Sequence, residues 1–239
     1  LFAGTIDKGI FVSYDRGETW KFTGEGLPDK FIQRIVVSSN YSNDQTVFLA
    51  MPGEGLFISR NQGKSWVRTG DGLDNNYVRT IDLSNNYSND QTLYVGASFG
   101  MIFKSVNAGE TWMQANFGLD NLKIWMIDIS PDFVNDQTIF ATGKTGLYKS
   151  VDAGDSWVPL SRDSFKGVIQ AVDISENFKE DTTLFIATTD GAFKSINAGE
   201  TWENISENYF QSRILEITSS PNFANDKTMY IGTLGDFVY

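Results

Sequence analysis

An eight-residue stretch occurs five times in this chain of 239 residues, and it constrains the fold more than any other feature of the sequence. Each copy has the form Ser-x-Asp/Asn-x-Gly-x-Ser/Thr-Trp, and the copies begin at Ser13, Ser59, Ser105, Ser150 and Ser195. Successive starts are therefore 46, 46, 45 and 45 residues apart. A fixed period of this length predicts an array in which each repeat forms one unit that packs against its neighbours.

Each copy, which we call a box turn, is expected to form a tight turn between two strands. The Asp or Asn side chain can accept backbone N–H groups two residues further on, and the glycine permits a positive φ. The tryptophan then buries a large ring. We expect this structural role for Asp15 and Trp20, Asn61 and Trp66, Asn107 and Trp112, Asp152 and Trp157, and Asn197 and Trp202.

Four apolar segments recur in each period, with the alternation and the β-branched or aromatic enrichment that predict strands. The first lies at 32–38, 78–84, 124–130, 168–175 and 213–219, and the second at 1–5, 47–51, 93–97, 139–143, 184–188 and 229–233. The third lies at 10–13, 56–59, 102–105, 147–150 and 192–195, and the fourth opens at each box tryptophan. No stretch has a sustained 3.6-residue period, so helix should be almost absent.

The loops that join the first and second segments are also repeated. Each has one aromatic residue that is expected to plug the core, as at Tyr41 and Phe133, and one aspartate, as at Asp44 and Asp136. The aspartate is expected to cap the loop's turn by accepting backbone N–H groups. A calcium site is the alternative, but each loop offers one reliable carboxylate where calcium needs several.

The five box turns resemble the Asp-box or BNR repeats of β-propellers. That superfamily includes sialidases, sortilin-type receptors, xyloglucanase-type glycoside hydrolases and photosystem II assembly factors. The resemblance implies an all-β propeller of four-stranded antiparallel blades, with one domain over residues 1–239 that is either five-bladed or a segment of a larger propeller. Residues 213–219 could complete the first blade, or 229–239 could begin a blade of their own. Sialidases also carry an arginine clamp and a Phe-Arg-Ile-Pro-like segment before the first box, and this chain has neither.

Composition removes several function classes. The chain has 19 Lys and Arg against 30 Asp and Glu, a formal net charge of −11, and neither His nor Cys. Histidine-dependent triads are therefore excluded, and nucleic acid or an anionic membrane is disfavoured as a partner. We expect no cofactor and no metal. We also expect no membrane insertion, because no apolar run reaches the length of a membrane-spanning helix. The oligomeric state and the localisation stay open, although the resemblance favours an extracellular or cell-surface location.

Antiparallel strands place the loops at two edges. The repeated edge carries the box turns and the near-identical loops between the first and second segments. The variable edge carries the loops between the second and third segments, and those that lead from the fourth segment into the next repeat. These differ from repeat to repeat, and variable loops on a rigid scaffold are where binding is usually placed.

One column of the repeat lies at the variable edge, on the same pleat face as the core residues two positions further on, and holds Gln33, Arg79, Trp125, Gln170 and Leu215. Together with nearby loop residues it predicts a stacking and hydrogen-bonding site for a glycan or a peptide. The alternative is a solvated rim. The candidate ligand-binding residues are Gln33, Tyr77, Arg79, Phe99, Lys123, Trp125, Lys144 and Gln170.

Asp82, Asp128 and Asp173 share a repeat position, and paired carboxylates are what glycoside hydrolysis needs. Because they recur and lie towards the repeated edge, we interpret them as hydrogen-bonding to neighbouring repeats and assign no catalytic residue. The sequence favours a non-catalytic binding or assembly module. The alternatives are a xyloglucanase-like glycoside hydrolase, or a fragment of one, and a structural repeat segment of a larger surface protein.

Overall fold

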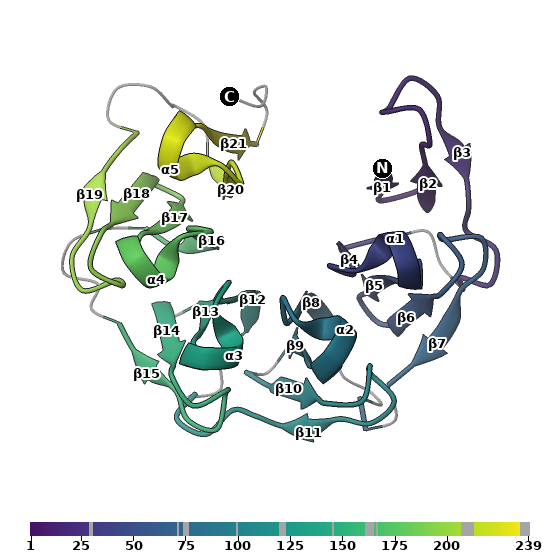
Figure 1. Ribbon diagram of the computed structural model, residues 1–239, viewed down its shortest axis with the longest axis horizontal. Coiled ribbons are helices and arrows are strands. Elements are labelled where there is room, and N and C mark those ends of the chain that lie inside the picture. Colours follow the sequence, from purple (N-terminus) through teal and green to yellow (C-terminus); the bar gives the residue numbers. More distant parts are fainter. Residues whose placement is uncertain are drawn as a thin grey trace. The chain divides into compact units, whose positions relative to one another are not determined.

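The computed structural model consists of antiparallel sheets joined by short loops and single-turn helices (Figure 1). It describes residues 1–28, 31–70, 72–73, 77–98, 100–119, 123–144, 146–160, 165, 167–206 and 213–234. The chain forms two compact units, Leu1–Ala115 and Asn116–Tyr239.

The first unit contains three sheets whose neighbouring strands are all antiparallel. The first has the order β1 (Phe2–Gly4), β2 (Ile10–Val12), β3 (Lys21–Phe22). The second has the order β4 (Arg34–Val37), β5 (Val47–Met51), β6 (Gly55–Ser59), β7 (Val67–Thr69). The third comprises β8 (Val78–Leu83), β9 (Leu93–Ala97), β10 (Ile102–Ser105) and β11 (Met113–Gln114).

The second unit repeats the same order. One sheet comprises β12 (Ile124–Ile129), β13 (Ile139–Gly143), β14 (Gly146–Ser150) and β15 (Val158–Pro159). The next comprises β16 (Ile169–Ile174), β17 (Leu184–Thr188), β18 (Gly191–Ser195) and β19 (Glu203–Asn204). The last pair, β20 (Ile214–Ser219) and β21 (Met229–Thr233), forms a two-stranded sheet. The predicted strands are thus confirmed, except that the fourth strand begins one residue after each box tryptophan rather than at it.

Single-turn helices occupy the loops between the first and second strands of five sheets. They are α1 (Tyr41–Asp44), α2 (Tyr87–Asp90), α3 (Phe133–Asp136), α4 (Phe178–Asp181) and α5 (Phe223–Asp226). Four residues are too few to show a helical period, which explains why the sequence predicts loops there. No helix in the described ranges is long and apolar enough to cross a membrane.

The aspartate that ends each of these helices fixes the turn, as predicted. In α1, Asp44 accepts the N–H of Thr46 at 2.8 Å and the hydroxyl of Ser38 at 2.5 Å. The same pair of bonds recurs at Asp90, Asp136, Asp181 and Asp226. The aromatic residue that opens the helix is buried at Tyr87, Phe133, Phe178 and Phe223, and half-buried at Tyr41.

The box turns are held by a hydrogen-bond set that the sequence predicts only in part. In the fifth turn the Ser195 hydroxyl donates to Asn197 and accepts the N–H of Gly199 at 2.9 Å. Asn197 accepts the N–H of Thr201, four residues further on rather than the predicted two. The turn needs two successive left-handed residues, because Ala198 has φ 54° and Gly199 has φ 91°.

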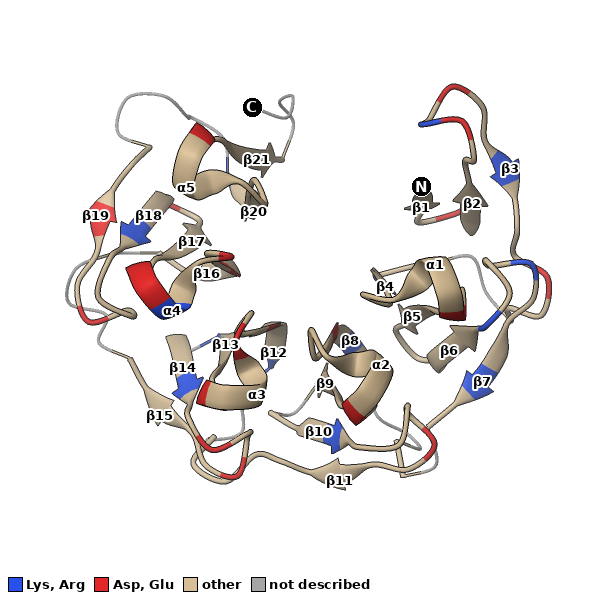
Figure 2. Cartoon of the chain, in the orientation of Figure 1, with Lys and Arg blue, Asp and Glu red and all other residues tan. Residues whose placement is uncertain are grey.

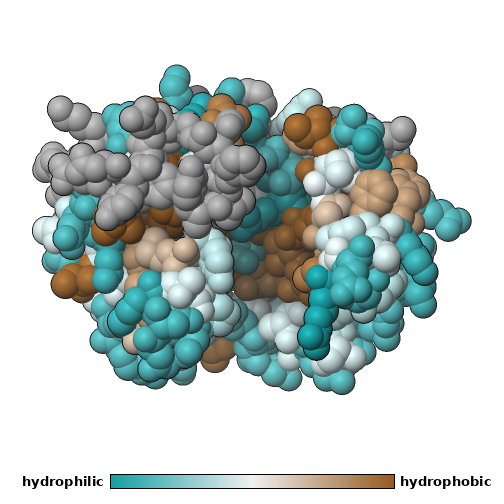
Figure 3. All heavy atoms as spheres, turned by 90° about the horizontal axis from the view of Figure 1, so that it is seen from above, coloured by the Kyte–Doolittle hydropathy of each residue, from teal (hydrophilic) through white to brown (hydrophobic). Residues whose placement is uncertain are grey.

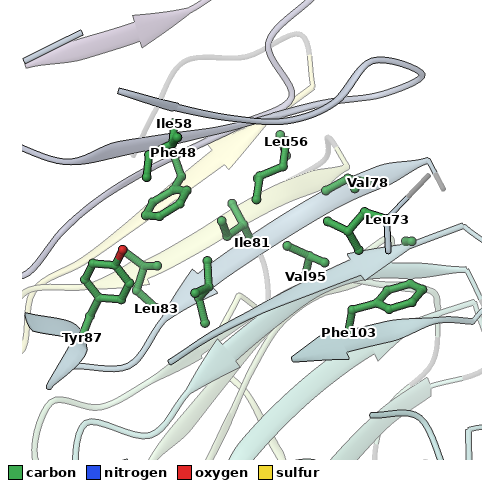
Figure 4. Close-up of a cluster of buried hydrophobic side chains, with 13 residues drawn as sticks. Phe48, Leu56, Ile58, Leu73, Val78, Ile81, Leu83, Tyr87, Val95 and Phe103 are labelled. Atoms are coloured by element: carbon green, nitrogen blue, oxygen red, sulfur yellow. The ribbon is translucent and has the colours of Figure 1, made fainter. Parts of the chain in front are cut away.

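The second strand of each four-stranded sheet is the most deeply buried. Every residue of β5, β9, β13 and β17 is buried. In the first unit a cluster that includes Phe48, Leu83 and Tyr87 joins the β4–β7 sheet to the β8–β11 sheet (Figure 4). In the second unit the Asp128 carboxylate accepts the N–H of Ile174 at 2.8 Å, which links β12 to the next sheet.

Asp173 makes the equivalent link from β16 to β20. Its carboxylate accepts the N–H of Ser219 at 2.9 Å and the Ser219 hydroxyl at 2.6 Å. Burial raises the pKa of the Asp173 carboxyl, while the bonds from Ser219 and Thr218 act in the opposite direction. The interpretation that Asp128 and Asp173 bond to neighbouring repeats is therefore confirmed, and these carboxylates are occupied by structural contacts.

The box tryptophans differ in burial. Trp66 is 4% exposed and packs among Ile32, Leu49 and Phe57. It donates its indole N–H at 2.7 Å to the carbonyl of Thr23, which directly follows β3 of the preceding sheet. Trp20 is 42% exposed and bonds only within its own turn, to Gly17. The expectation that every box tryptophan is buried is wrong for Trp20, which no described sheet precedes in the chain, and Trp112 is only half-buried.

Trp66→Ala is expected to destabilise the protein by about 3–5 kcal/mol, because it empties a packed seam between two sheets. Trp20→Ala is the matched control at the same repeat position and is expected to cost much less. Urea unfolding of both variants measures the difference. Equal losses of stability would contradict the packing role of Trp66.

Asp15→Asn is expected to reduce the pH dependence of stability in acid. Hydrogen bonds from the side chain and backbone of Thr19 and from Ser13 lower the pKa of Asp15 from 3.8 to about 2. A lowered folded-state pKa means that this stabilisation is present above pH 3.8 and is lost as the pH falls towards 2. Asparagine already occupies this position in three box turns and does not titrate. Unfolding curves between pH 2 and 5 measure the slope, and an unchanged slope would contradict the assignment.

Candidate functional site

The strand register places the two kinds of loop at opposite edges of each four-stranded sheet, as predicted. In the β4–β7 sheet Arg34 pairs with Ala50 and Met51 pairs with Gly55, so the loops of the variable edge leave from one end. At the other end Val37 pairs with Val47, which pairs with Ser59. The helices and box turns therefore share the repeated edge.

A β-bulge occurs in four of the first strands at the predicted column. In β8, Val78 pairs with Ala97 and Thr80 with Gly96, which leaves Arg79 as the extra residue. Trp125, Gln170 and Leu215 are the extra residues of β12, β16 and β20. The predicted pleat face of this column is therefore wrong, because a bulge interrupts the two-residue alternation. Bulges re-aim side chains and are frequent beside functional sites.

In the first unit both Tyr77 and Arg79 are hydrogen-bonded to Ser98, the residue directly after β9. Arg79 donates its Nε–H to the Ser98 hydroxyl at 3.2 Å, and Ser98 donates its N–H to the Tyr77 carbonyl at 2.9 Å. Tyr77 is 48% exposed, and a Cβ added at Gly53 in the preceding sheet would lie 3.3 Å from the Tyr77 hydroxyl. Gln33 is exposed just before β4. Phe99 lies outside the described residues.

In the second unit one residue of the column, Gln170, is already hydrogen-bonded to other residues of the chain. Gln170 accepts a hydrogen bond from the Arg213 guanidinium at 2.5 Å and donates to the Val168 carbonyl at 3.3 Å. Trp125 is half-buried, and Lys123 and Lys144 are exposed. Arg213 is a residue of this edge that the sequence interpretation left out. Its only signal is its place directly before the strand that carries the column.

Within each unit the variable edge therefore combines aromatic surface with hydrogen-bond donors: Tyr77 with Arg79 in the first unit, and Trp125 with Lys123 and Lys144 in the second. The face seen in Figure 3 has apolar patches among polar residues, and Figure 2 shows where the charged residues lie in a chain with 19 Lys and Arg against 30 Asp and Glu. Lys123, Lys144 and Arg79 supply cationic donors to this acidic chain. Such an arrangement can stack on a ring and hydrogen-bond to its substituents. Among the described residues, no group of three or more carboxylates is arranged to hold a metal ion.

The repeated edge is not featureless. One pocket of the first unit, of about 580 Å³, is lined by Tyr14, Arg16 and Tyr41 together with Leu1, Val12 and Ser13. A second, of about 310 Å³, lies between α1 and α2 beside Arg60. The repetition of its loops predicts a scaffold role for this edge, but both pockets are lined by residues at which the repeats differ, such as Tyr14 and Arg60.

No protein-family model matches the chain, and no curated protein matches it in sequence. Solved structures do. An ancestral GH74 enzyme matches with a TM-score of 0.80 and 16% identity, over 98% of this chain and 33% of that one. The GH74 xyloglucanase from Xanthomonas campestris matches with a TM-score of 0.69 and 15% identity, over 98% of this chain and 42% of that one.

YCF48 bound to a D1 peptide matches with a TM-score of 0.61 and 14% identity, over 87% of this chain and 64% of that one. This chain thus spans about a third to two fifths of the two GH74 structures. At these identities the likeness concerns the fold alone. With six antiparallel sheets, mostly four-stranded, and β-propeller proteins as its structural neighbours, the chain has an all-β propeller fold.

Proposed function

We propose that this chain is a non-catalytic binding or assembly module that holds a glycan or an extended peptide at its variable edge. The observation that carries the proposal is the recurring bulge. Four first strands carry an extra residue at the same place, and three of these residues are Arg79, Trp125 and Gln170. A bulge that recurs in the backbone while its side chain changes from repeat to repeat is what we expect of a binding edge on a rigid scaffold.

The chemistry of these side chains favours a ligand with flat or ring-shaped groups and polar substituents. Trp125 and Tyr77 offer aromatic surface, and a half-exposed aromatic ring contributes contact area with little loss of conformational entropy. Arg79, Lys123 and Lys144 donate hydrogen bonds. By contrast, the side chains of the box turns are already engaged in their own turns, as Asn197 is with Ser195 and Thr201.

Three structural neighbours support the two ligand classes. One is a YCF48 protein bound to a D1 peptide, and the others are GH74 enzymes, including a xyloglucanase. The second candidate function is therefore part of a GH74-like glycoside hydrolase. The high structural similarity to GH74 enzymes over nearly the whole chain favours it. The engagement of Asp128 and Asp173 in links between sheets disfavours these carboxylates as the catalytic pair.

A glycan and peptide array probed with the whole chain tests the binding proposal. For any binder found, Trp125→Ala and Arg79→Ala are each expected to weaken binding by about tenfold or more, the effect of losing one stacking or charged contact. Tyr14→Ala is the control, because Tyr14 is 59% exposed on a box turn of the repeated edge. Binding that survives both variable-edge changes with an unchanged melting temperature would contradict the proposed site.

Incubation of the chain with xyloglucan, followed by measurement of reducing ends, tests the hydrolase alternative. The binding-module proposal predicts no release above the rate without protein. Release that is abolished by substituting a carboxylate of the variable edge, such as Glu54→Gln, with folding intact, would establish the enzyme instead. Adding the chain to an active GH74 enzyme under the same conditions controls for inhibitors in the preparation.

A further inference from the structure

The pocket between α1 and α2 lies at a seam between two repeats, and one equivalent seam of the second unit, between α3 and α4, is bridged by an ion pair. At the α3–α4 seam the Lys179 ammonium lies 3.1 Å from the Asp132 carboxylate, and this ion pair bridges the two helices. A hydrogen bond from Asn135 and the bond from Lys179 lower the pKa of Asp132, and the bond to Asp132 raises the pKa of Lys179. The repeat positions that correspond to Asp132 and Lys179 at the α1–α2 seam are Asn40 and Ser88. Both are uncharged and both line the pocket.

A cation is present at the α1–α2 seam, but at a different position. Arg60 is the second residue of its box turn, where the other four turns have Tyr14, Val106, Val151 and Ile196. It lines the pocket and is exposed. Its guanidinium has no hydrogen bond or ion pair with any residue that the structure describes. Four of the five repeats have Asn at the position of Asn40, and only Lys179 is a cation at the position of Ser88, so the α3–α4 ion pair is the exception among the repeats. The feature that distinguishes the α1–α2 seam is Arg60.

The other groups in the pocket are neutral donors and acceptors, together with two carboxylates. Tyr87 is buried with its ring edge-to-face against Phe48 at 5.8 Å, at the end of the hydrophobic cluster in Figure 4. Burial raises its pKa to about 12, so the phenol stays neutral. The Gln91 amide has no partner among the described residues. Asp44 is engaged by Ser38 and Thr46, and Glu110 is exposed at the rim.

This set matches a ligand that carries one carboxylate and several hydroxyl groups. A guanidinium binds a planar carboxylate through two parallel hydrogen bonds. Hydroxyl groups can donate to the Asp44 and Glu110 carboxylates and exchange hydrogen bonds with the amides of Asn40 and Gln91. A simple anion would meet the repulsion of the two carboxylates without those donors. A volume of about 310 Å³ is at the small end for ligand pockets and suits a single ring.

We infer that the α1–α2 pocket is a second binding site, distinct from the variable edge, for a hydroxylated carboxylate of one ring such as a uronic acid. Arg60 holds the carboxylate, and Asn40, Ser88 and Gln91 contact the hydroxyl groups. The inference does not depend on the proposed function, because none of these residues belongs to the variable edge.

Titration of the whole chain with glucuronate, glucose and acetate at constant ionic strength, followed by NMR, tests the inference. Glucuronate is expected to bind with a dissociation constant on the order of 1 mM, and glucose and acetate at least about tenfold more weakly. Arg60→Met is expected to weaken glucuronate binding at least about tenfold. Lys64→Met is the matched control, since Lys64 is an exposed cation of the same box turn that does not line the pocket.

A double variant tests the location without removing the arginine. Asn40→Asp with Ser88→Lys transplants the α3–α4 ion pair into this seam and leaves the net charge unchanged. It is expected to block glucuronate binding while the melting temperature is kept or raised. Trp125→Ala is expected to leave glucuronate binding unchanged. No glucuronate binding, equal binding of acetate or glucose, or binding that persists in Arg60→Met or in the folded double variant would overturn the inference.

Discussion

The serine hydroxyl of each box turn is the interaction on which the repeat depends. In all five turns it donates to the Asp or Asn two residues on and accepts the N–H of the glycine four residues on. This double role holds two successive residues in the left-handed region, where a non-glycine residue such as Ala198 is disfavoured. The turn then fixes the position of the tryptophan just before the fourth strand, and the Trp66 ring packs at the seam with the preceding sheet.

Most of the fold can be predicted from the sequence because the information is given five times. Strand positions, the loop aspartates and the edge to which each loop belongs follow from aligning the repeats. The features that cannot be predicted are those that alignment does not distinguish. A bulge leaves no mark in residue types, so Arg79 is assigned to the wrong pleat face. The exposure of Trp20 depends on which sheets surround it, and a four-residue helix is shorter than the period that would reveal it.

Less of the candidate sites than of the fold can be predicted from the sequence. Residue types indicate that the variable edge carries aromatic and cationic side chains, but contacts between neighbouring repeats decide which of them are free. Arg213 engages Gln170 across such a seam, and nothing in either local sequence indicates it. Tyr77 is placed against Gly53 of the preceding sheet in the same way. Burial and pairing in a repeat protein arise at seams, and seams join residues about 45 positions apart.

Departures from the repeat are therefore more informative about function than the repeat itself. A position that is the same in five copies is explained by the turn or the core that all five copies need. Arg60 stands where the four other box turns have Val, Ile or Tyr. The scaffold does not require an arginine at this position, since the other four box turns form without one. A free, exposed arginine contributes little to stability. Its removal should therefore change ligand binding far more than folding, which is the behaviour that separates a site from a scaffold.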